Sequence, residues 1–274
     1  MTDRDALVSI VVTTRNSGRT LEACLTSIRA QLYRPIELIV IDNSSHDETV
    51  AIAERFADVI EQYGPERSAQ RNHGARLARG TYLLFIDSDM ALSVGVVAEC
   101  VGALALDGAP AVVIPELSVG DGFLARCRAF ERSFYAGDDD IEAARFFTRA
   151  SFEFAGGFDE SLTGPEDWDL SIRVAKGRHL PRSPSYITHD EGTLRLRDVL
   201  QKKRGYSRSF LQYWRKHRGS GIRQANLIFR PSFLRDWRRL IRHPVLTLGV
   251  LSLKSLEAAA GLSGIIEGPN RSGH

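Results

Sequence analysis

Thr81-Tyr-Leu-Leu-Phe-Ile-Asp-Ser-Asp89 is the stretch that decides the fold of this chain. Its first six residues form a run typical of a strand that is buried on both faces of a sheet. Asp87 and Asp89 follow directly, so both carboxylates emerge where that strand ends. Binding sites of open α/β sheets lie at this edge. Two such aspartates can reach a hard cation that also binds phosphate oxygens, although the tripeptide taken alone favours a solvated turn.

The first 120 residues alternate between strand and helix patterns. The strand patterns are short and apolar, and they cover Ser9–Thr14, Glu37–Ile41, Val59–Glu61, Tyr82–Ile86 and Ala111–Ile114. Helix patterns lie between them, at Thr20–Gln31, Asp47–Phe56, Ser68–Ala78 and Ser93–Ala105. Repeated units of this kind predict an α/β fold whose central sheet is mostly parallel and has helices on both faces.

The middle of the chain, residues 121–190, has a less regular pattern. The expected elements there are a helix, a strand, a glycine turn, a second helix and a second strand, at Phe123–Tyr135, Arg145–Thr148, Gly156-Gly157, Pro165 onward and Ser185–His189. Proline fits the first turn of a helix, and a pair of glycines fits a tight turn.

Composition excludes several classes of protein. The chain has 274 residues and three cysteines, which are far apart and lie in apolar helical patterns. This usage predicts reduced core thiols rather than a disulfide framework, and without a Cys-x-x-Cys pair it argues against a structural zinc site. The N-terminus runs directly into a strand pattern, so we expect no signal peptide and a cytoplasmic location.

The net charge of +2 conceals a marked asymmetry along the chain. Residues 1–190 hold 19 Lys and Arg against 29 Asp and Glu, whereas residues 191–243 hold 15 against 3. Asymmetry of this size indicates an anionic partner for the basic segment, and a solvated charged face is the alternative.

The C-terminal part reads as a set of basic or apolar helices. We expect a long basic helix at Leu194–Arg218, a second at Pro231–Arg242 and a leucine-rich one at Val245–Ala260. The last is too short and too interrupted by charge for a confident transmembrane span, but it fits a membrane interface. Packing of its leucines on the rest of the protein is the alternative. The predicted domains are therefore 1–192 and a basic, amphipathic helical region, 193–274.

Five motifs appear in an order and at a spacing that resemble glycosyltransferase family 2, the inverting enzymes of the A-type fold. They are Ser9-Ile-Val-Val-Thr-Thr-Arg-Asn16, Ile39-Val-Ile-Asp-Asn-Ser-Ser-His-Asp-Glu-Thr49, Arg71-Asn-His-Gly74, Phe85-Ile-Asp-Ser-Asp-Met90, and Gly156-Gly-Phe-Asp-Glu160 followed by Pro165-Glu-Asp-Trp-Asp169. The resemblance covers roughly residues 7–215. No Gly-x-Gly-x-x-Gly follows the first strand, which counts against a dinucleotide-dependent dehydrogenase.

The resemblance implies a metal site. It makes Asp89 the direct metal ligand, gives Asp87 to the ribose or to the metal's waters, and places the remaining ligand at His189. A carboxylate, an imidazole and diphosphate oxygens together suit Mn²⁺ or Mg²⁺.

The resemblance also implies a nucleotide site. Asp42 would accept the imide N–H of a uracil or thymine ring, with a turn aspartate as the alternative reading. Thr14 and Arg15 would lie beside the nucleotide, although Arg15 departs from the aromatic residue that is more usual there. Arg71 offers a planar fork of donors that suits a diphosphate, and a surface arginine is the alternative.

Asp167 is the candidate base that takes the proton of the acceptor hydroxyl. Glu166 is its competitor, and because adjacent residues point in different directions, we expect only one of them in the attacking position. Trp168 fits either a wall of the acceptor pocket or the core. Lys203 or Arg204 would close over the leaving diphosphate.

The function expected from these residues is metal-dependent inverting transfer of a sugar from a UDP- or dTDP-linked donor. The acceptor is a hydroxyl or phosphate, on a saccharide or a lipid-linked molecule, in bacterial-type cell-surface glycan synthesis. The enzyme would sit on the inner face of an anionic membrane without binding nucleic acid. The alternative is a scaffold that binds nucleic acid or membrane and carries a degenerate glycosyltransferase fold. The sequence does not indicate an oligomeric state.

Overall fold

The computed structural model describes residues 5–217 and 231–267, which form two compact units. The first unit comprises Met1–Glu116, Ala143–Glu160 and Asp167–Asp190. The second comprises Leu117–Glu142, Ser161–Glu166 and Glu191–His274. Each unit is described by itself. Residues 218–230, part of the predicted basic stretch, lie outside the described residues, and the domain boundary predicted at residue 192 stays a prediction.

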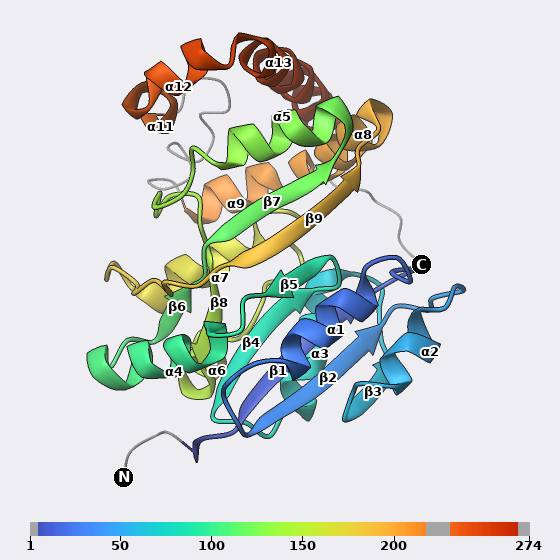
Figure 1. The fold of residues 1–274 in the computed structure, drawn as a ribbon, viewed down its shortest axis with the longest axis vertical. Coiled ribbons are helices and arrows are strands. Elements are labelled where there is room, and N and C mark those ends of the chain that lie inside the picture. Colours follow the sequence, from blue (N-terminus) through green and yellow to red (C-terminus); the bar gives the residue numbers. More distant parts are fainter. Residues whose placement is uncertain (1–4, 218–230, 268–274) are drawn as a thin grey trace. The chain divides into compact units, whose positions relative to one another are not determined.

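The first unit is built on a six-stranded sheet of order β3-β2-β1-β4-β8-β6 (Figure 1). Its strands are β1 (Val8–Thr14), β2 (Ile36–Asp42), β3 (Val59–Gln62), β4 (Tyr82–Asp87), β6 (Ala111–Val113) and β8 (Ala144–Thr148). Strands β3, β2, β1 and β4 are mutually parallel, whereas β8 runs antiparallel to both β4 and β6. The mostly parallel sheet is therefore confirmed.

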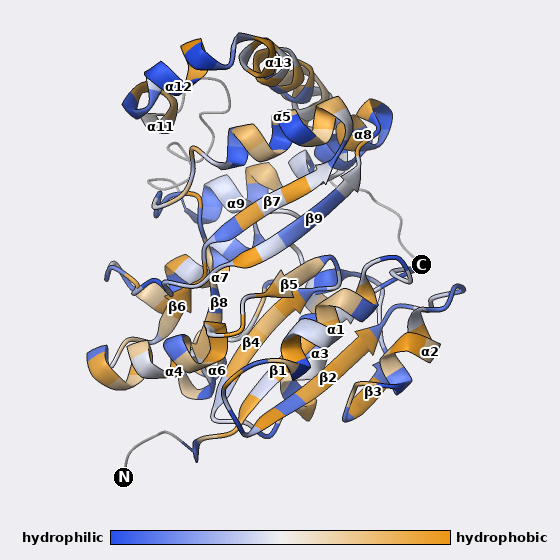
Figure 2. Ribbon diagram, in the orientation of Figure 1, coloured by the Kyte–Doolittle hydropathy of each residue, from blue (hydrophilic) through white to orange (hydrophobic). Residues whose placement is uncertain are grey.

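Helices cover both faces of this sheet. They are α1 (Leu21–Arg29), α2 (Thr49–Glu54), α3 (Arg67–Leu77), α4 (Val96–Asp107), α6 (Arg149–Phe154) and α7 (Glu166–Ala175), of which α7 belongs to the first unit from Asp167 on. Successive strand residues point to opposite faces, so Leu84 and Ile86 join one hydrophobic cluster while Leu83 and Phe85 join the other. Burial on both faces explains why the strand sequences are continuously apolar, as the orange of β2 and β4 in Figure 2 shows.

Two short elements that the sequence did not reveal complete a second sheet, of order β5-β9-β7. They are β5 (Met90–Leu92) and β7 (Glu116–Asp121), and the third strand is β9 (Ile187–Thr193). Strand β5 pairs antiparallel with β9, which brings Met90 opposite His189. This pairing places His189 beside the residues that follow β4.

The second unit is mainly helical. It contains α5 (Gly122–Arg132), α8 (Leu196–Ser207), α9 (Phe210–Lys216), α11 (Pro231–Arg235), α12 (Trp237–Arg242) and α13 (Pro244–Glu267). The basic helical stretch expected at Leu194–Arg218 is divided into α8 and α9 by a short break at Arg208 and Ser209, where the Ser209 hydroxyl donates to the backbone oxygen of Thr163. The predicted helix Pro231–Arg242 likewise divides at Asp236.

The three cysteines are buried and unpaired, as predicted. Burial raises the pKa of the Cys24 thiol above its ordinary value, and the carboxylates of Asp89 and Asp87 raise it further. All three therefore behave as core residues rather than as nucleophiles.

Candidate active site

The candidate site forms where three parallel strands end together. The register pairs Thr14 with Asp42 and Thr13 with Asp87, so the last residues of β1, β2 and β4 lie at one edge of the sheet. Continuous backbone pairing of β1 with β2 and with β4 fixes these positions. The sequence motifs that end in polar residues therefore converge, as predicted.

Arg71 links two of the predicted site carboxylates. Its side chain is fully buried, and it donates from Nη2 to Asp87 Oδ1 at 2.7 Å and from Nη1 to Asp167 Oδ1 at 2.8 Å. The planar guanidinium thus holds the candidate base at a fixed place beside the end of β4. The predicted contact of Arg71 with a diphosphate stays a prediction, and both of its terminal nitrogens already bind carboxylates.

Asp87 lies in a strongly cationic setting. Arg67 Nη1 is 3.6 Å from Asp87 Oδ2, and Arg145 Nη1 is 3.9 Å from the same oxygen. Burial by itself would raise the pKa of Asp87, but the guanidinium groups of Arg71, Arg67 and Arg145 outweigh burial and hold the pKa well below its usual range. Asp87 is therefore ionised across the physiological range.

Asp89, which directly precedes β5, lies next to His189 of β9. His189 Nε2 is 3.3 Å from Asp89 Oδ2, and the backbone N–H of Asp190 donates to Asp89 O at 2.8 Å. Asp89 Oδ1 is buried and accepts no hydrogen bond within the described residues. A buried carboxylate oxygen without a donor indicates that something else satisfies it, because such groups are otherwise bonded.

The donor set at this point fits a divalent cation completed by its substrate. Within residues 5–217 and 231–267, no group of three or more His, Cys, Asp or Glu side chains is arranged to hold a metal. Asp89 and His189 could supply one oxygen and one nitrogen ligand, and diphosphate oxygens and water would then have to fill the other positions.

Glu116 and Arg145 are functional candidates that sequence reasoning missed. His189 Nδ1 lies 3.7 Å from Glu116 Oε2, and Glu116 Oε1 accepts a hydrogen bond from Arg145 Nε at 2.7 Å. Burial lowers the pKa of Arg145, but the carboxylates of Glu116, Asp167 and Asp87 raise it further than burial lowers it. Glu116 therefore lies between Arg145 and His189 and contacts both side chains. No local sequence pattern marks Glu116 or Arg145, because the three residues come from three separate strands.

Asp167 and Glu166 differ in environment, as expected for adjacent residues at the start of α7. The Asp167 side chain is 23% exposed, whereas Glu166 is buried and its carboxylate accepts the backbone N–H of Gly164. Of the two, Asp167 has the side chain that solvent reaches. Trp168 is half-buried and remains compatible with either predicted role.

The residues predicted to bind the nucleotide lie at the ends of β1 and β2, on the same sheet edge. Both carboxylate oxygens of Asp42 accept from Ser45, one from its N–H and one from its hydroxyl, so Asp42 shapes the turn after β2. Each oxygen keeps a further lone pair for a ligand. Thr14 Oγ1 is buried and has no hydrogen-bond partner among the described residues, and Arg15 is exposed.

Lys203 and Arg204 belong to the second unit. Lys203 is half-buried on α8, where burial lowers the pKa of its amine. Arg204 pairs with Glu267 at the end of α13, and its Nε donates to Glu267 Oε2 at 3.0 Å. Both side chains thus contribute to the packing of helices in that unit, and their predicted contact with a diphosphate stays a prediction.

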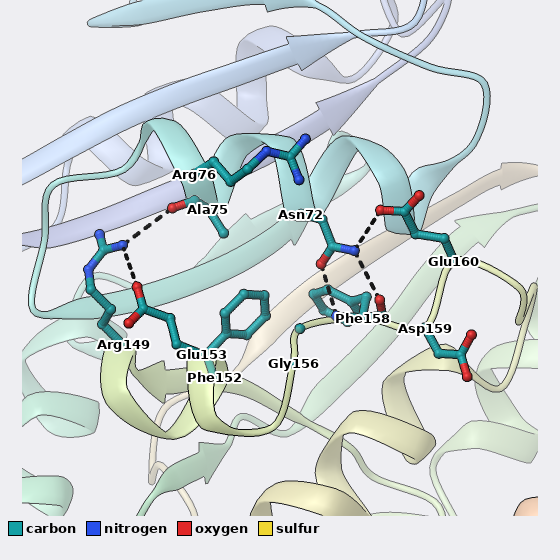
Figure 3. A pocket seen from close by; sticks show the side chains of 11 residues that line it. Asn72, Ala75, Arg76, Arg149, Phe152, Glu153, Gly156, Phe158, Asp159 and Glu160 are labelled. Carbon is teal, nitrogen blue, oxygen red and sulfur yellow. Dashed lines mark hydrogen bonds and ion pairs between the residues drawn. The ribbon is translucent and has the colours of Figure 1, made fainter.

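The motif Arg71–Gly74 is hydrogen-bonded to the motif Gly156–Glu160. The Asn72 side chain donates to Phe158 O at 2.9 Å and to Glu160 Oε1 at 2.8 Å, and it accepts the N–H of Phe158 (Figure 3). Arg71 stacks over the Phe158 ring, with its Cζ 5.1 Å from the centroid. The turn that starts at Gly156 is thereby fixed to α3, which orients Arg71 toward Asp87 and Asp167.

A hollow of about 790 Å³ lies beside this clamp. Its lining combines apolar rings with charged side chains, among them Asn72, Arg149, Phe152, Glu153 and Phe158 (Figure 3). Arg149 and Glu153 lie one turn apart on α6, with Arg149 Nη1 3.4 Å from Glu153 Oε1. Asp87, Asp89 and Asp167 do not line this hollow, so it is separate from the carboxylate site.

The strand-end carboxylates, the Asp89–His189 pair and the mostly parallel sheet define a glycosyltransferase of the A-type fold. The model of Glycosyl transferase family 2 matches residues 9–158, which is more than half of the chain. The chain therefore belongs to glycosyl transferase family 2 and is a transferase.

Two curated relatives place the chain within this family. The PGL/p-HBAD biosynthesis glycosyltransferase of Mycobacterium bovis (strain BCG / Pasteur 1173P2) is 30% identical over 184 residues, which are 61% of this chain and 69% of that protein. The putative glycosyltransferase EpsH of Bacillus subtilis (strain 168) is 38% identical over 88 residues, which are 30% of this chain and 26% of EpsH. The chain thus spans about a quarter of the length of EpsH.

Solved structures support the fold. The mannosyltransferase PcManGT from Pyrobaculum calidifontis, in complex with GDP-Man and Mn²⁺, aligns over 96% of this chain and 88% of its own, with a TM-score of 0.66 and 18% identity. TarS 1–349 of S. aureus in complex with UDP-GlcNAc aligns over 94% and 88%, with a TM-score of 0.55 and 17% identity. At such identities the likeness shows the fold alone.

Proposed function

We propose that this protein is a metal-dependent inverting glycosyltransferase that uses a nucleotide-diphosphate sugar. The observation that carries the proposal is the Asp89–His189 pair, with its buried carboxylate oxygen that lacks a donor, close to Asp87 on the same strand end. Two structural neighbours were solved with nucleotide sugars, one of them also with Mn²⁺.

Asp89 and His189 would hold the Mn²⁺ or Mg²⁺. Such a cation neutralises the negative charge that develops on the departing diphosphate. Glu116 orients the His189 ring through Nδ1, which keeps Nε2 directed at the metal position. Asp42, Thr14 and Arg15 would bind the nucleoside, and the acidic residue at the end of β2 favours a UDP- or dTDP-linked donor with an imide N–H.

Asp167 would accept the proton of the acceptor hydroxyl as its oxygen attacks the anomeric carbon from the side opposite the leaving diphosphate. One oxygen of Asp167 is bound by Arg71, so the carboxylate is held in place while its other oxygen remains to take the proton. Inversion of the anomeric configuration follows from this single displacement. Lys203 or Arg204 would close over the diphosphate.

The acceptor that we propose is a hydroxyl or phosphate on a saccharide or a lipid-linked molecule, in cell-surface glycan synthesis. The basic composition of residues 191–243 supports this, because it favours a position at the inner face of an anionic membrane.

Metal-assisted nucleotide binding is tested by calorimetry with UDP and dTDP, with and without Mn²⁺. We expect Mn²⁺ to tighten binding to the wild-type protein. The Asp89→Ala variant should lose that gain, because it lacks the oxygen ligand, whereas Asp107→Ala, which removes an exposed carboxylate from α4, should keep it. Equal affinity with and without the metal in the wild-type protein contradicts the proposal.

The base is tested with Asp167→Asn. The amide keeps an oxygen that can accept from Arg71 but cannot take a proton, so transfer should fall about 10²–10⁴-fold while nucleotide affinity stays nearly unchanged. Turnover is measured with a panel of nucleotide sugars, and NMR of the product reports its anomeric configuration. A product that retains the donor configuration rules out the inverting mechanism.

A further inference from the structure

Helix α13 carries its charges on one side only. Between Val245 and Ile266 the sequence has two charged residues, Lys254 and Glu257, and they are 5% and 4% exposed. Every residue on the outer side of this 24-residue helix before its end at Glu267 is therefore uncharged. A helix that faces water normally shows the reverse pattern, with its charged residues outward.

An ion-pair network holds the two charges inside. Lys254 Nζ lies 2.7 Å from Glu131 Oε1 of α5, and Glu257 pairs with Arg128 of the same helix. Arg128 Nη1 is in turn 2.9 Å from Glu131 Oε2. Buried ion pairs seldom stabilise a fold more than apolar residues of the same size would. Their consequence here is orientation, because they determine which side of α13 faces away from the unit.

Glycines allow the same inner side to pack closely. An added Cβ at Gly249 would collide with Cys127 and Phe123 of α5, and one at Gly264 would collide with the backbone of Arg204 in α8. Val250 and Leu253 are also buried here, so these two side chains follow the alternative given for this helix, packing on the rest of the protein. The inner side of α13 is thus buried against α5 and α8.

The outer side of α13 is an exposed apolar face. We define the outer face by its exposed large side chains: Val245, Leu248, Leu251, Leu256, Leu262 and Ile266. Their exposed fractions run from 43% to 84%. Apolar side chains gathered on one surface, rather than scattered singly, mark a site of interaction.

The neighbouring α12 adds basic and aromatic side chains next to this face. Trp237 is 51% exposed, with Arg238 stacked over its ring, and Ile241 is 66% exposed. Arg242 is exposed on the same short helix, which packs on α13 through a hydrogen bond from the Thr247 hydroxyl to Leu240 O. Exposed arginines and a tryptophan beside an apolar helix face complement anionic headgroups above hydrocarbon.

The helix cannot cross a bilayer in this arrangement, although α13 is long and apolar enough to do so. A span would carry the inner side, with Lys254 and Glu257, into hydrocarbon together with the helix it packs on. That helix, α8, exposes charged side chains such as Arg197, Asp198 and Lys202. The geometry fits a helix that lies in the plane of the interface.

We propose that the outer face of α13, together with Trp237, Arg238 and Arg242 of α12, binds an anionic phospholipid surface as an in-plane amphipathic element. This deepens the membrane location given under the proposed function and names the residues that make the contact. Binding is measured without donor or acceptor, so its outcome is independent of sugar transfer.

The test is flotation of the full chain with vesicles of phosphatidylcholine alone or with about a third of phosphatidylglycerol, because anionic lipid gives the surface the negative potential that attracts basic residues. The wild-type protein should float with the anionic vesicles. Leu248→Glu with Leu262→Glu should reduce the partition coefficient about tenfold or more. The matched control is Leu106→Glu, because Leu106 of α4 is 88% exposed and lies in the first unit, and it should float like the wild type.

The electrostatic part is tested with Arg238→Gln and Arg242→Gln. Each change should weaken binding to anionic vesicles about fivefold and flatten its dependence on salt. A second measurement uses the wild-type protein and changes no charge. Brominated lipid should quench the fluorescence of Trp237, and Trp237→Phe is the reference. Circular dichroism and thermal unfolding should be the same in every variant, which shows that each one is folded.

Three outcomes overturn the proposal. The first is equal flotation of the wild type and the Leu248→Glu, Leu262→Glu variant, or flotation of neither. The second is a wild-type dimer that this variant makes monomeric while vesicles bind nothing, because the outer face would then join two copies of the chain. The third is retention of the wild type on vesicles after an alkaline carbonate wash, which would indicate a span rather than an in-plane helix.

Discussion

At Asp87, burial and the neighbouring charges have opposite effects on the pKa of the carboxyl group. Its carboxylate contacts Arg71 directly and lies near Arg67 and Arg145, and these guanidinium groups keep its pKa well below the ordinary value despite burial. A carboxyl group whose pKa is lower in the folded than in the unfolded protein contributes stability above the unfolded pKa, about 3.9. This contribution is lost as the pH falls through the folded pKa.

Asp87→Asn should therefore flatten the acid side of the stability profile. At pH 7 the variant should be less stable than the wild type. The difference should shrink as the pH falls below about 4, because Asp87 of the unfolded chain then takes up a proton, whereas folded Asp87, with its lowered pKa, stays ionised to a lower pH. Urea unfolding from pH 7 to pH 2 measures this. Asp107→Asn is the control, because it removes an exposed carboxylate on α4. A constant difference between Asp87→Asn and the wild type at every pH would contradict the lowered pKa.

At the scale of elements, the packing of α3 on the sheet depends on a single glycine. A Cβ on Gly74 would collide with Val11 of β1 and come within 3.2 Å of Ile41 of β2. Both neighbours belong to the core between α3 and the sheet, so neither can move away freely. The same helix carries Arg71 and Asn72, which means that its distance from β1 also sets the position of the site.

Gly74→Ala should lower the free energy of unfolding by about 1–3 kcal/mol through overpacking. Gly102→Ala in α4 offers a matched comparison, because nothing lies within 4 Å of its added Cβ. That change should stabilise the protein by about 0.5–1 kcal/mol, since alanine loses less backbone entropy in a helix than glycine does. Thermal unfolding of both variants is the measurement, and shifts in the same direction would show that the close approach of α3 is not limiting.

At the scale of the whole molecule, the ion pairs of α5 and α13 belong to one unit and the sheet to the other. Burial by itself would raise the pKa of Glu131, but Lys254 and Arg128 lower it to about 2. Glu131 is therefore charged at neutral pH and needs its partners. Removing one member of a buried pair leaves an uncompensated charge, which typically costs about 3–5 kcal/mol.

Lys254→Met should thus loosen the second unit and leave the first largely unchanged. Hydrogen exchange should become faster in α5, α8 and α13, while β1 and β4 keep their protection. Ser255→Met, at an exposed neighbouring position of α13, should leave both patterns as they are. Uniformly faster exchange in both units after Lys254→Met would mean that the two units unfold as one.

Local patterns in the sequence predicted most strands and helices of the first unit. The apolar runs that end in Asp42 and Asp87 predict buried parallel strands, and parallel strands necessarily bring their carboxyl ends to one edge. The candidate ligands Asp89 and His189 and the candidate base Asp167 were proposed from the resemblance of the sequence motifs to glycosyltransferase family 2. The short strands β5 and β7 could not be predicted, because pairing rather than propensity defines them.

Only the tertiary structure decided which distant side chains meet. Arg71 bridges Asp87 and Asp167, and Arg145 and Glu116 lie behind His189, because the packing of separate strands and helices brings them together. The same holds for α13. Its sequence gives an apolar helix with two charges, but pairing with Arg128 and Glu131 decides that those charges face inward and that the apolar face remains outside. Periodicity is a local property, whereas the partner of a buried charge is fixed by the fold as a whole.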